Sequence, residues 1–134
     1  MVLAGDAMEA KKYKEIPGYS VISQLFLGEN CTIYRAVSDR DGIPTILKML
    51  SAPYPSPLTL ARFRQEFKLV KSLKLQGVPK VFELSHPGDY WMISFLDIKA
   101  TSLTQLMQTN SLEPRMVTRI ALAAAKVLAE IHQA

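Results

Sequence analysis

The stretch Thr45-Ile46-Leu47-Lys48-Met49-Leu50 decides the fold, because one lysine interrupts an apolar run there. β-Branched and large apolar residues of this kind favour a strand, which we predict over residues 44–50. Alternation along a strand places Ile46, Lys48 and Leu50 on one face of it. An ammonium among apolar neighbours needs a partner if that face is covered. We therefore expect Lys48 to meet an acidic side chain from another element.

The expected partner is Glu66, on a helix predicted over residues 58–75 and ended by Gly77. Glu66 lies three residues after Phe63 and four before Val70, so it shares their side of the helix. A lysine held by a helix glutamate beside a glycine turn is suited to anionic phosphates. The apolar positions of this helix, at steps of three and four, are Leu60, Phe63, Phe67, Val70 and Leu73.

Strand and helix patterns continue on both sides of this pair. The connections before and after residues 44–50 are short, which favours antiparallel pairing. The fold class predicted is therefore α+β, with a five-stranded antiparallel sheet, one long helix packed on it and two helices at the end. The other predicted strands cover residues 19–27, 32–37, 78–84 and 90–96. A short helix is predicted over residues 102–108, opened by a capping box of Ser102 and Gln105. The last helix is predicted to be capped by Ser111, with Pro114 in its first turn.

Composition narrows the class of protein. The length of 134 residues fits one domain, and the 49% apolar content supports a packed core. The only cysteine, Cys31, excludes an internal disulfide framework and favours a cytoplasmic location. No apolar run reaches the ~18 residues of a membrane helix, so we expect no membrane partner. The basic residues behind the net charge of +4 are scattered without interleaved aromatics, which argues against nucleic acid, and two distant histidines with one cysteine predict no metal site.

Four segments together resemble the N-terminal, ATP-binding lobe of a eukaryotic-type serine/threonine protein kinase domain. Residues 25–36, Leu25-Phe26-Leu27-Gly28-Glu29-Asn30-Cys31-Thr32-Ile33-Tyr34-Arg35-Ala36, are similar to the glycine-rich strand-turn-strand of that family. Thr45-Ile46-Leu47-Lys48 stands where the family has Val-Ala-Ile-Lys, and Phe63-Arg64-Gln65-Glu66 stands on the αC-type helix. Ile93-Ser94-Phe95-Leu96-Asp97 resembles the fifth strand and the hinge. The resemblance covers residues 16–134, and its texture is similar to the kinase modules of large cyanobacterial multidomain sensor kinases.

This resemblance implies an ATP site. Gly28 and neighbouring amides would cover the phosphates, Lys48 would hold the α- and β-phosphates, and Glu66 would orient Lys48. Phe95 takes the gatekeeper position and residues 96–98 would face adenine, although a one-residue shift there stays open. The implied ATP-binding residues are Leu25, Gly28, Ile33, Ile46, Lys48, Glu66, Phe95, Leu96, Asp97 and Ile98.

The sequence also departs from the family pattern. Phe26 and Cys31 fill the first and third glycine positions of the loop, and Ile46 replaces the small residue that roofs adenine. The loop would then fit phosphate less closely, and Ile46 would crowd the base. No His-Arg-Asp, metal-binding asparagine or Asp-Phe-Gly segment of the family occurs, so we assign no catalytic or metal residue and expect Mg2+ only if a C-terminal lobe is supplied.

The expected organisation is a flexible lead-in over residues 1–15, a kinase-like N-lobe with hinge over 16–98, and the first helices of an incomplete C-lobe over 99–134. The last helix carries an apolar stripe, which predicts self-association or a complementary chain. The stripe consists of Val117, Ile120, Ala124, Val127, Leu128 and Ile131.

Three hypotheses for function follow. The first is the ATP-binding lobe of a serine/threonine kinase, probed by nucleotide binding and without turnover of its own. The alternative is a non-catalytic, pseudokinase-like interaction module, which the residues at positions 26, 31 and 46 favour. A third, weaker interpretation is a gene remnant that has no function of its own.

Overall fold

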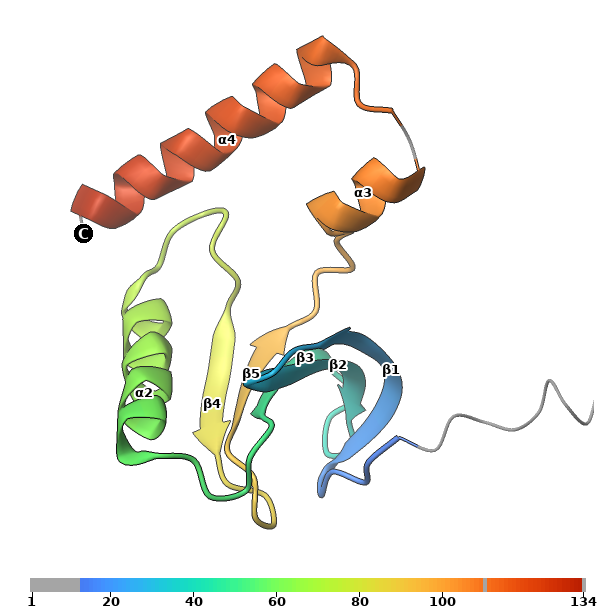
Figure 1. Cartoon of the computed structure of the whole chain (residues 1–134), viewed down its shortest axis with the longest axis vertical. Helices are drawn as coiled ribbons and strands as arrows, with labels where there is room; N and C mark the ends of the chain where they lie inside the picture. The colour runs from blue at the N-terminus through green and yellow to red at the C-terminus, as the bar shows by residue number, and fades with distance from the viewer. Residues whose placement is uncertain (1–12, 110, 134) are drawn as a thin grey trace, which may run out of the picture.

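The computed structural model describes residues 13–109 and 111–133. Five strands form a single antiparallel sheet in the order β1-β2-β3-β5-β4, and a long helix lies beside it (Figure 1). The predicted α+β class and five-stranded sheet are confirmed. The strands are β1 (Tyr19–Leu27), β2 (Cys31–Ser38), β3 (Pro44–Leu50), β4 (Val81–Ser85) and β5 (Met92–Leu96), and the helices are α2 (Pro57–Ser72), α3 (Leu103–Thr109) and α4 (Pro114–Gln133).

The central strand β3 separates two cores. Leu47 and Met49 point to one face of the sheet, where they are buried with Tyr34 and other side chains. Leu50 points to the opposite face and packs with Phe63 of α2 and Ile93 of β5. Burial of such a side chain contributes about 1.5–3 kcal/mol to the stability of the fold. A shift of β3 by one residue would move each of these side chains to the opposite face of the sheet. The two cores therefore hold Lys48 on the α2 side of the sheet.

The segment before β1 covers the face of the sheet that is turned away from α2. Residues 1–12 of the expected lead-in lie outside the described part of the chain. The Tyr13 ring meets Tyr34 edge-on with 6.5 Å between centroids, and the Lys14 ammonium lies 2.7 Å from the centre of the Tyr90 ring. Ile16 is buried in the same core. Residues 13–16 therefore form part of the packed structure.

Helix α2 begins and ends at recognisable signals. The Ser56 hydroxyl accepts a hydrogen bond from the Thr59 N–H, and Pro57 follows as the first helical residue. The helix ends at Ser72, three residues before the predicted end, because Leu73 takes an extended conformation while its N–H still bonds Leu69 O and Val70 O. Phe63 is the buried residue of the helix. This placement turns the side chains of its inner face toward β3 and β4.

Strands β4 and β5 are each shorter than predicted. β4 begins at Val81 rather than at residue 78, and Pro79, which lacks an N–H, lies in the excluded segment. β5 begins at Met92 rather than at residue 90, after the N–H of Tyr90 has bonded Pro87 O in the connecting turn. The end of β5, from which the hinge leaves the sheet, is at Leu96 as predicted.

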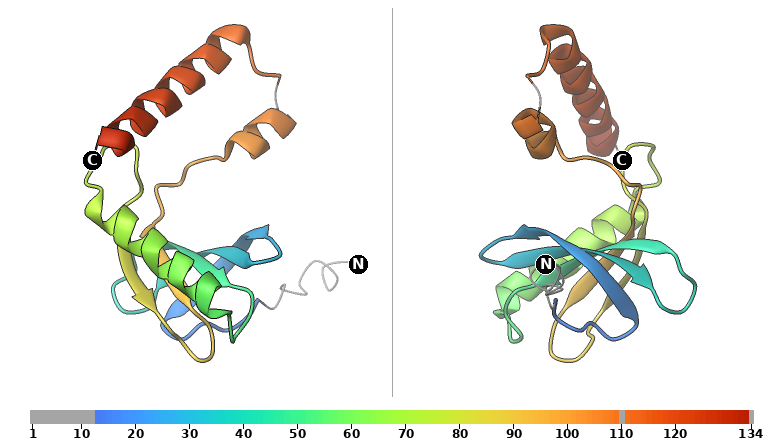
Figure 2. Two further views of the ribbon diagram at one scale, coloured as in Figure 1. Left: turned by 60° about the vertical axis from the view of Figure 1, so that its left-hand side comes forward. Right: turned by 90° about the vertical axis from the view of Figure 1, so that its right-hand side faces the viewer.

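The two last helices lie apart from the sheet (Figures 1 and 2). The predicted capping box of α3 is present: the Ser102 hydroxyl accepts from the Gln105 N–H, and the Gln105 side chain accepts from the Ser102 N–H. Helix α4 runs back toward the α2–β4 loop, where a Cβ on Gly77 would lie 2.8 Å from a Val127 methyl carbon. Gly77 also has φ +92°, so this close approach needs glycine.

Helix α4 buries none of its described residues. Several of its apolar side chains are exposed by about half or more, among them Val117 and Leu128 of the predicted stripe. Ile120, Val127 and Ile131 of that stripe are half-buried. No helix in the described ranges combines the length and the apolar character that a membrane crossing needs.

Candidate functional site

The predicted ion pair between β3 and α2 is present. The Lys48 Nζ lies 2.7 Å from Glu66 Oε1 and 3.0 Å from Glu66 Oε2, so both carboxylate oxygens accept from the ammonium. The side chains are 26% and 38% exposed. An ion pair with this much access to water contributes at most about 1 kcal/mol to stability. Its partners can therefore exchange contacts with a ligand at low cost.

A pocket of about 370 Å³ opens beside Lys48 on the same face of the sheet. Cross-strand pairing builds its wall, because Arg35, Ile46 and Phe95 stand in one row across β2, β3 and β5. Ile33 and Lys48 form the next row. Most of the lining side chains are apolar, and the charged exceptions are Arg35, Lys48 and Asp97. The full lining is Leu25, Ile33, Arg35, Ile46, Lys48, Pro79, Phe95, Leu96, Asp97, Ile98 and Ala100.

The structure brings most of the predicted ATP-binding residues together. Eight of the ten line this pocket: Leu25, Ile33, Ile46, Lys48, Phe95, Leu96, Asp97 and Ile98. Glu66 lines a smaller pocket of about 170 Å³, which shares Lys48 with the first and also contains Cys31 and Arg62. Their role in binding nucleotide stays a prediction.

Gly28, the tenth residue, lies in the β1–β2 turn and lines neither pocket. Its N–H donates to Cys31 O over 2.9 Å, which closes the turn. A Cβ at Gly28 would lie 2.6 Å from a ring carbon of Phe26. The ring of Phe26, at the first glycine position of the family pattern, therefore packs against the one glycine that remains.

Three residues of the pocket were missed by the sequence analysis. Arg35 lies two residues after Ile33, so strand alternation alone was enough to place it on the pocket face. Pro79 and Ala100 lie in irregular segments, where no periodic pattern indicates which way a residue faces.

The hinge after β5 has most of its backbone donors occupied. The N–H of Leu96 donates to Lys80 O over 2.8 Å, and the N–H of Asp97 donates to Pro44 O over 3.0 Å. The N–H of Lys99 donates to the Asp97 carboxylate over 2.8 Å. Between them, the N–H of Ile98 donates no hydrogen bond within the described part of the chain. Ile98 also lines the pocket, so its N–H is the candidate donor for a ligand among residues 96–99.

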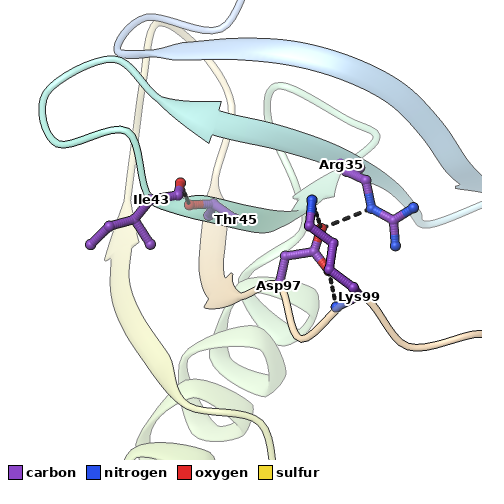
Figure 3. Close-up of polar contacts among 5 residues, drawn as sticks. All are labelled: Arg35, Ile43, Thr45, Asp97 and Lys99. Atoms are coloured by element: carbon purple, nitrogen blue, oxygen red, sulfur yellow. Dashed lines mark hydrogen bonds and ion pairs between the residues drawn. The ribbon is translucent and has the colours of Figure 1, made fainter.

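The Asp97 side chain turns toward Arg35 and Lys99 (Figure 3). Its carboxylate is 2% exposed and accepts from Arg35 Nε over 2.8 Å. Burial raises the pKa of the Asp97 carboxyl, but the hydrogen bonds from the Lys99 N–H and Arg35 outweigh burial and leave the pKa below its ordinary value. Asp97 is therefore an anion held by the protein itself, and any contact with a ligand base falls to its backbone.

The described side chains were also compared with the requirements of a metal site. Among residues 13–109 and 111–133, no three His, Cys, Asp or Glu side chains gather in a way that could hold an ion.

The sequence and the fold of the chain were compared with those of known proteins. No protein-family model and no curated protein match the sequence. Among solved structures, the crystal structure of a cysteine-to-alanine mutant of the PknI kinase domain from Mycobacterium tuberculosis matches with a TM-score of 0.72 at 22% identity. The match covers 94% of this chain and 53% of that one, so the chain spans about half the length of that kinase domain. The chain therefore has the fold of the N-terminal lobe of a protein kinase domain, continued by two helices.

Proposed function

We propose that this chain is an ATP-binding lobe of the serine/threonine kinase type. The observation that carries the proposal is the Lys48–Glu66 pair at the edge of an apolar pocket, where the Ile98 N–H of the hinge has no partner among the described residues. An apolar slot with a few placed polar groups is the usual form of a small-molecule site, and its volume is within the usual range.

The proposed binding mode divides the nucleotide between these groups. The adenine ring lies against Ile33 and Ile46, and the Ile98 N–H donates to a ring nitrogen. The Lys48 ammonium binds α- and β-phosphate oxygens, and Glu66 holds that ammonium in place. Because the Gly28 N–H is already used within the turn, the amides of Glu29 and Asn30 are those that cover the phosphates.

The proposal does not extend to turnover by this chain alone. Phosphoryl transfer needs a residue that accepts the hydroxyl proton and side chains that hold magnesium. The kinase segments that supply them, His-Arg-Asp and Asp-Phe-Gly, do not occur in the sequence. In this proposal the chain positions ATP, and transfer to a protein serine or threonine needs residues from outside it.

A second candidate is a non-catalytic interaction module of the pseudokinase type. Two observations favour it: the Phe26 ring packs on Gly28 at the phosphate loop, and α4 leaves apolar side chains such as Leu122 and Leu128 exposed. In this alternative α4 would bind a complementary chain or a second copy, and the pocket would stay empty of nucleotide.

Nucleotide titration separates the two candidates. ATP at ten times its dissociation constant should stabilise the chain by about 1.4 kcal/mol, a rise in melting temperature of about 4–6 °C. Lys48→Ala should remove most of the rise, because the phosphates lose their cation. Lys68→Ala is the matched control, since Lys68 lies exposed on α2. If ATP raised the melting temperature of Lys48→Ala as much as that of the parent, this site would be wrong. If ATP raised the melting temperature of neither the parent nor the variants, the second candidate would be selected.

A further inference from the structure

Two hydrogen-bond donors and one further ammonium group surround the buried carboxylate of Asp97 in the hinge. Arg35 Nε reaches one oxygen over 2.8 Å from β2, and Lys99 Nζ lies 3.6 Å from the same oxygen. The Lys99 N–H donates to the other oxygen over 2.8 Å. We call Arg35, Asp97 and Lys99 the Asp97 cluster (Figure 3). The side chains of the cluster join the hinge to β2. The Asp97 N–H joins the hinge to β3, because it donates to Pro44 O.

The Asp97 cluster also sets the path of the backbone after the hinge. Lys99 has φ +58°, the left-handed region that residues other than glycine enter at a cost of about 1–2 kcal/mol. An aspartate carboxylate that accepts a hydrogen bond from the N–H two residues on forms a turn motif that offsets this cost. The turn begins at Asp97 and has Ile98 at its bend. Its geometry leaves the Ile98 N–H as the hinge donor without a protein partner in the described residues.

We propose that the Asp97 cluster positions the hinge for base recognition, an inference that rests on the proposed function. Asp97 accepts from the Lys99 N–H, so among the described residues 96–99 the N–H of Ile98 is the donor left for the ligand. Asp97 also holds the Arg35 guanidinium at one end of the pocket, where an unpaired cation would otherwise intrude on the slot for the ring. Arg35 and Asp97 are thus positioning residues that act through the hinge and do not need to touch the base.

The location of the cluster separates its effect from that of Lys48. Arg35 stands in the cross-strand row of Ile46 and Phe95, whereas Lys48 stands in the neighbouring row with Ile33. Arg35 of the first row pairs with Asp97, and Lys48 of the second row pairs with Glu66. Loss of the Asp97 cluster should therefore weaken recognition of the base while the phosphate end of the pocket keeps its cation.

The test measures the two ends of the ligand separately, with adenosine for the base and inorganic tripolyphosphate for the phosphates. Arg35→Met and Asp97→Asn should each weaken adenosine binding at least tenfold, observed by ligand NMR, and leave tripolyphosphate affinity unchanged. Arg40→Met is the matched control: Arg40 is an exposed arginine that lies outside the Asp97 cluster and does not line the pocket, so this variant should bind adenosine like the parent. The double variant should lose no more than the larger single loss, because both changes break one contact.

Different failures have different meanings. If the parent chain binds neither probe, the proposed function falls and this inference with it. If the parent binds both, and Arg35→Met and Asp97→Asn bind adenosine as tightly as the parent, the inference alone is overturned. If the variants lose both probes together with their melting transition, the Asp97 cluster is only structural and the inference is again overturned. Arg35→Met keeps the bond between Asp97 and Lys99, so it remains informative where Asp97→Asn fails to fold.

Discussion

The two ion pairs of the pocket differ in access to water. In the Lys48–Glu66 pair both side chains are partly exposed, 26% and 38%, whereas Asp97 is 2% exposed beside Arg35 at 28%. An exposed pair is weak and exchangeable, while a buried carboxylate depends on the donors that the protein supplies. Under the proposed function the difference would divide the work: Lys48 would be free to change partners when a phosphate arrives, and Asp97 would stay fixed to hold the hinge.

The largest expected effect comes from breaking the buried pair. Asp97→Ala removes the acceptor of Arg35 Nε and of the Lys99 N–H, and it leaves Lys99 in a left-handed conformation without support. We expect a loss of about 2–3 kcal/mol in the free energy of unfolding, below the range for fully buried pairs because Arg35 reaches water. Urea unfolding followed by circular dichroism measures it. A loss under about 0.5 kcal/mol would remove the distinction between the two pairs.

Glu66→Ala should show the opposite balance between stability and binding. The exposed pair contributes at most about 1 kcal/mol, so unfolding should change little. ATP affinity should fall about tenfold, because Lys48 loses the group that orients it toward the phosphates. Isothermal titration gives the affinity, and Gln65→Ala, next along α2 on an exposed position, is the control. Should Glu66→Ala bind ATP as the parent does, Glu66 would have no orienting role.

The contrast also explains what could be predicted from the sequence. Lys48 and Glu66 were predicted because each sits in a periodic element, so alternation on β3 and the three-four spacing on α2 give their directions. Their partnership was predicted from the cost of leaving a charge unpaired under a helix, a cost that the partial exposure of both side chains makes small. The antiparallel pairing of strands joined by short links, β1 with β2, β2 with β3 and β4 with β5, followed from the same patterns, whereas the pairing of β3 with β5 did not.

The Asp97 cluster could not be predicted by such reasoning. Arg35 and Asp97 are 62 residues apart, and Asp97 follows the last residue of β5, where the strand period stops. The turn at Lys99 depends on φ +58°, which a lysine does not signal in a sequence. The early end of α2 at Ser72 has a similar origin, because Leu73 continues the apolar spacing of the helix but not its backbone conformation.

A smaller effect should follow from opening the roof of the pocket. Ile46 stands opposite both Arg35 and Phe95, at the position where a larger residue was expected to crowd the base. Ile46→Ala should raise adenosine affinity about threefold if crowding limits binding, at a cost of about 1–2 kcal/mol in stability, since Ile46 is only half-buried. Val37→Ala, a half-buried residue of β2 outside the pocket, controls for the lost stability. A weaker affinity would show that Ile46 provides contact area and does not crowd the base.

The smallest expected effect is the pH dependence of stability that comes from the ionisation of Asp97. The pKa of Asp97 in the folded chain lies below its ordinary value of 3.8, since the donors from Lys99 and Arg35 outweigh burial. Folding is therefore favoured by its ionised form: this contribution is complete above about pH 5 and is lost as pH falls through the lowered folded pKa. The difference in unfolding free energy between the parent and Asp97→Asn should be constant from about pH 5 to 8 and shrink below about pH 4. A difference that grew on acidification would mean that Asp97 is neutral in the folded chain, and the Asp97 cluster would then hold no anion for Arg35.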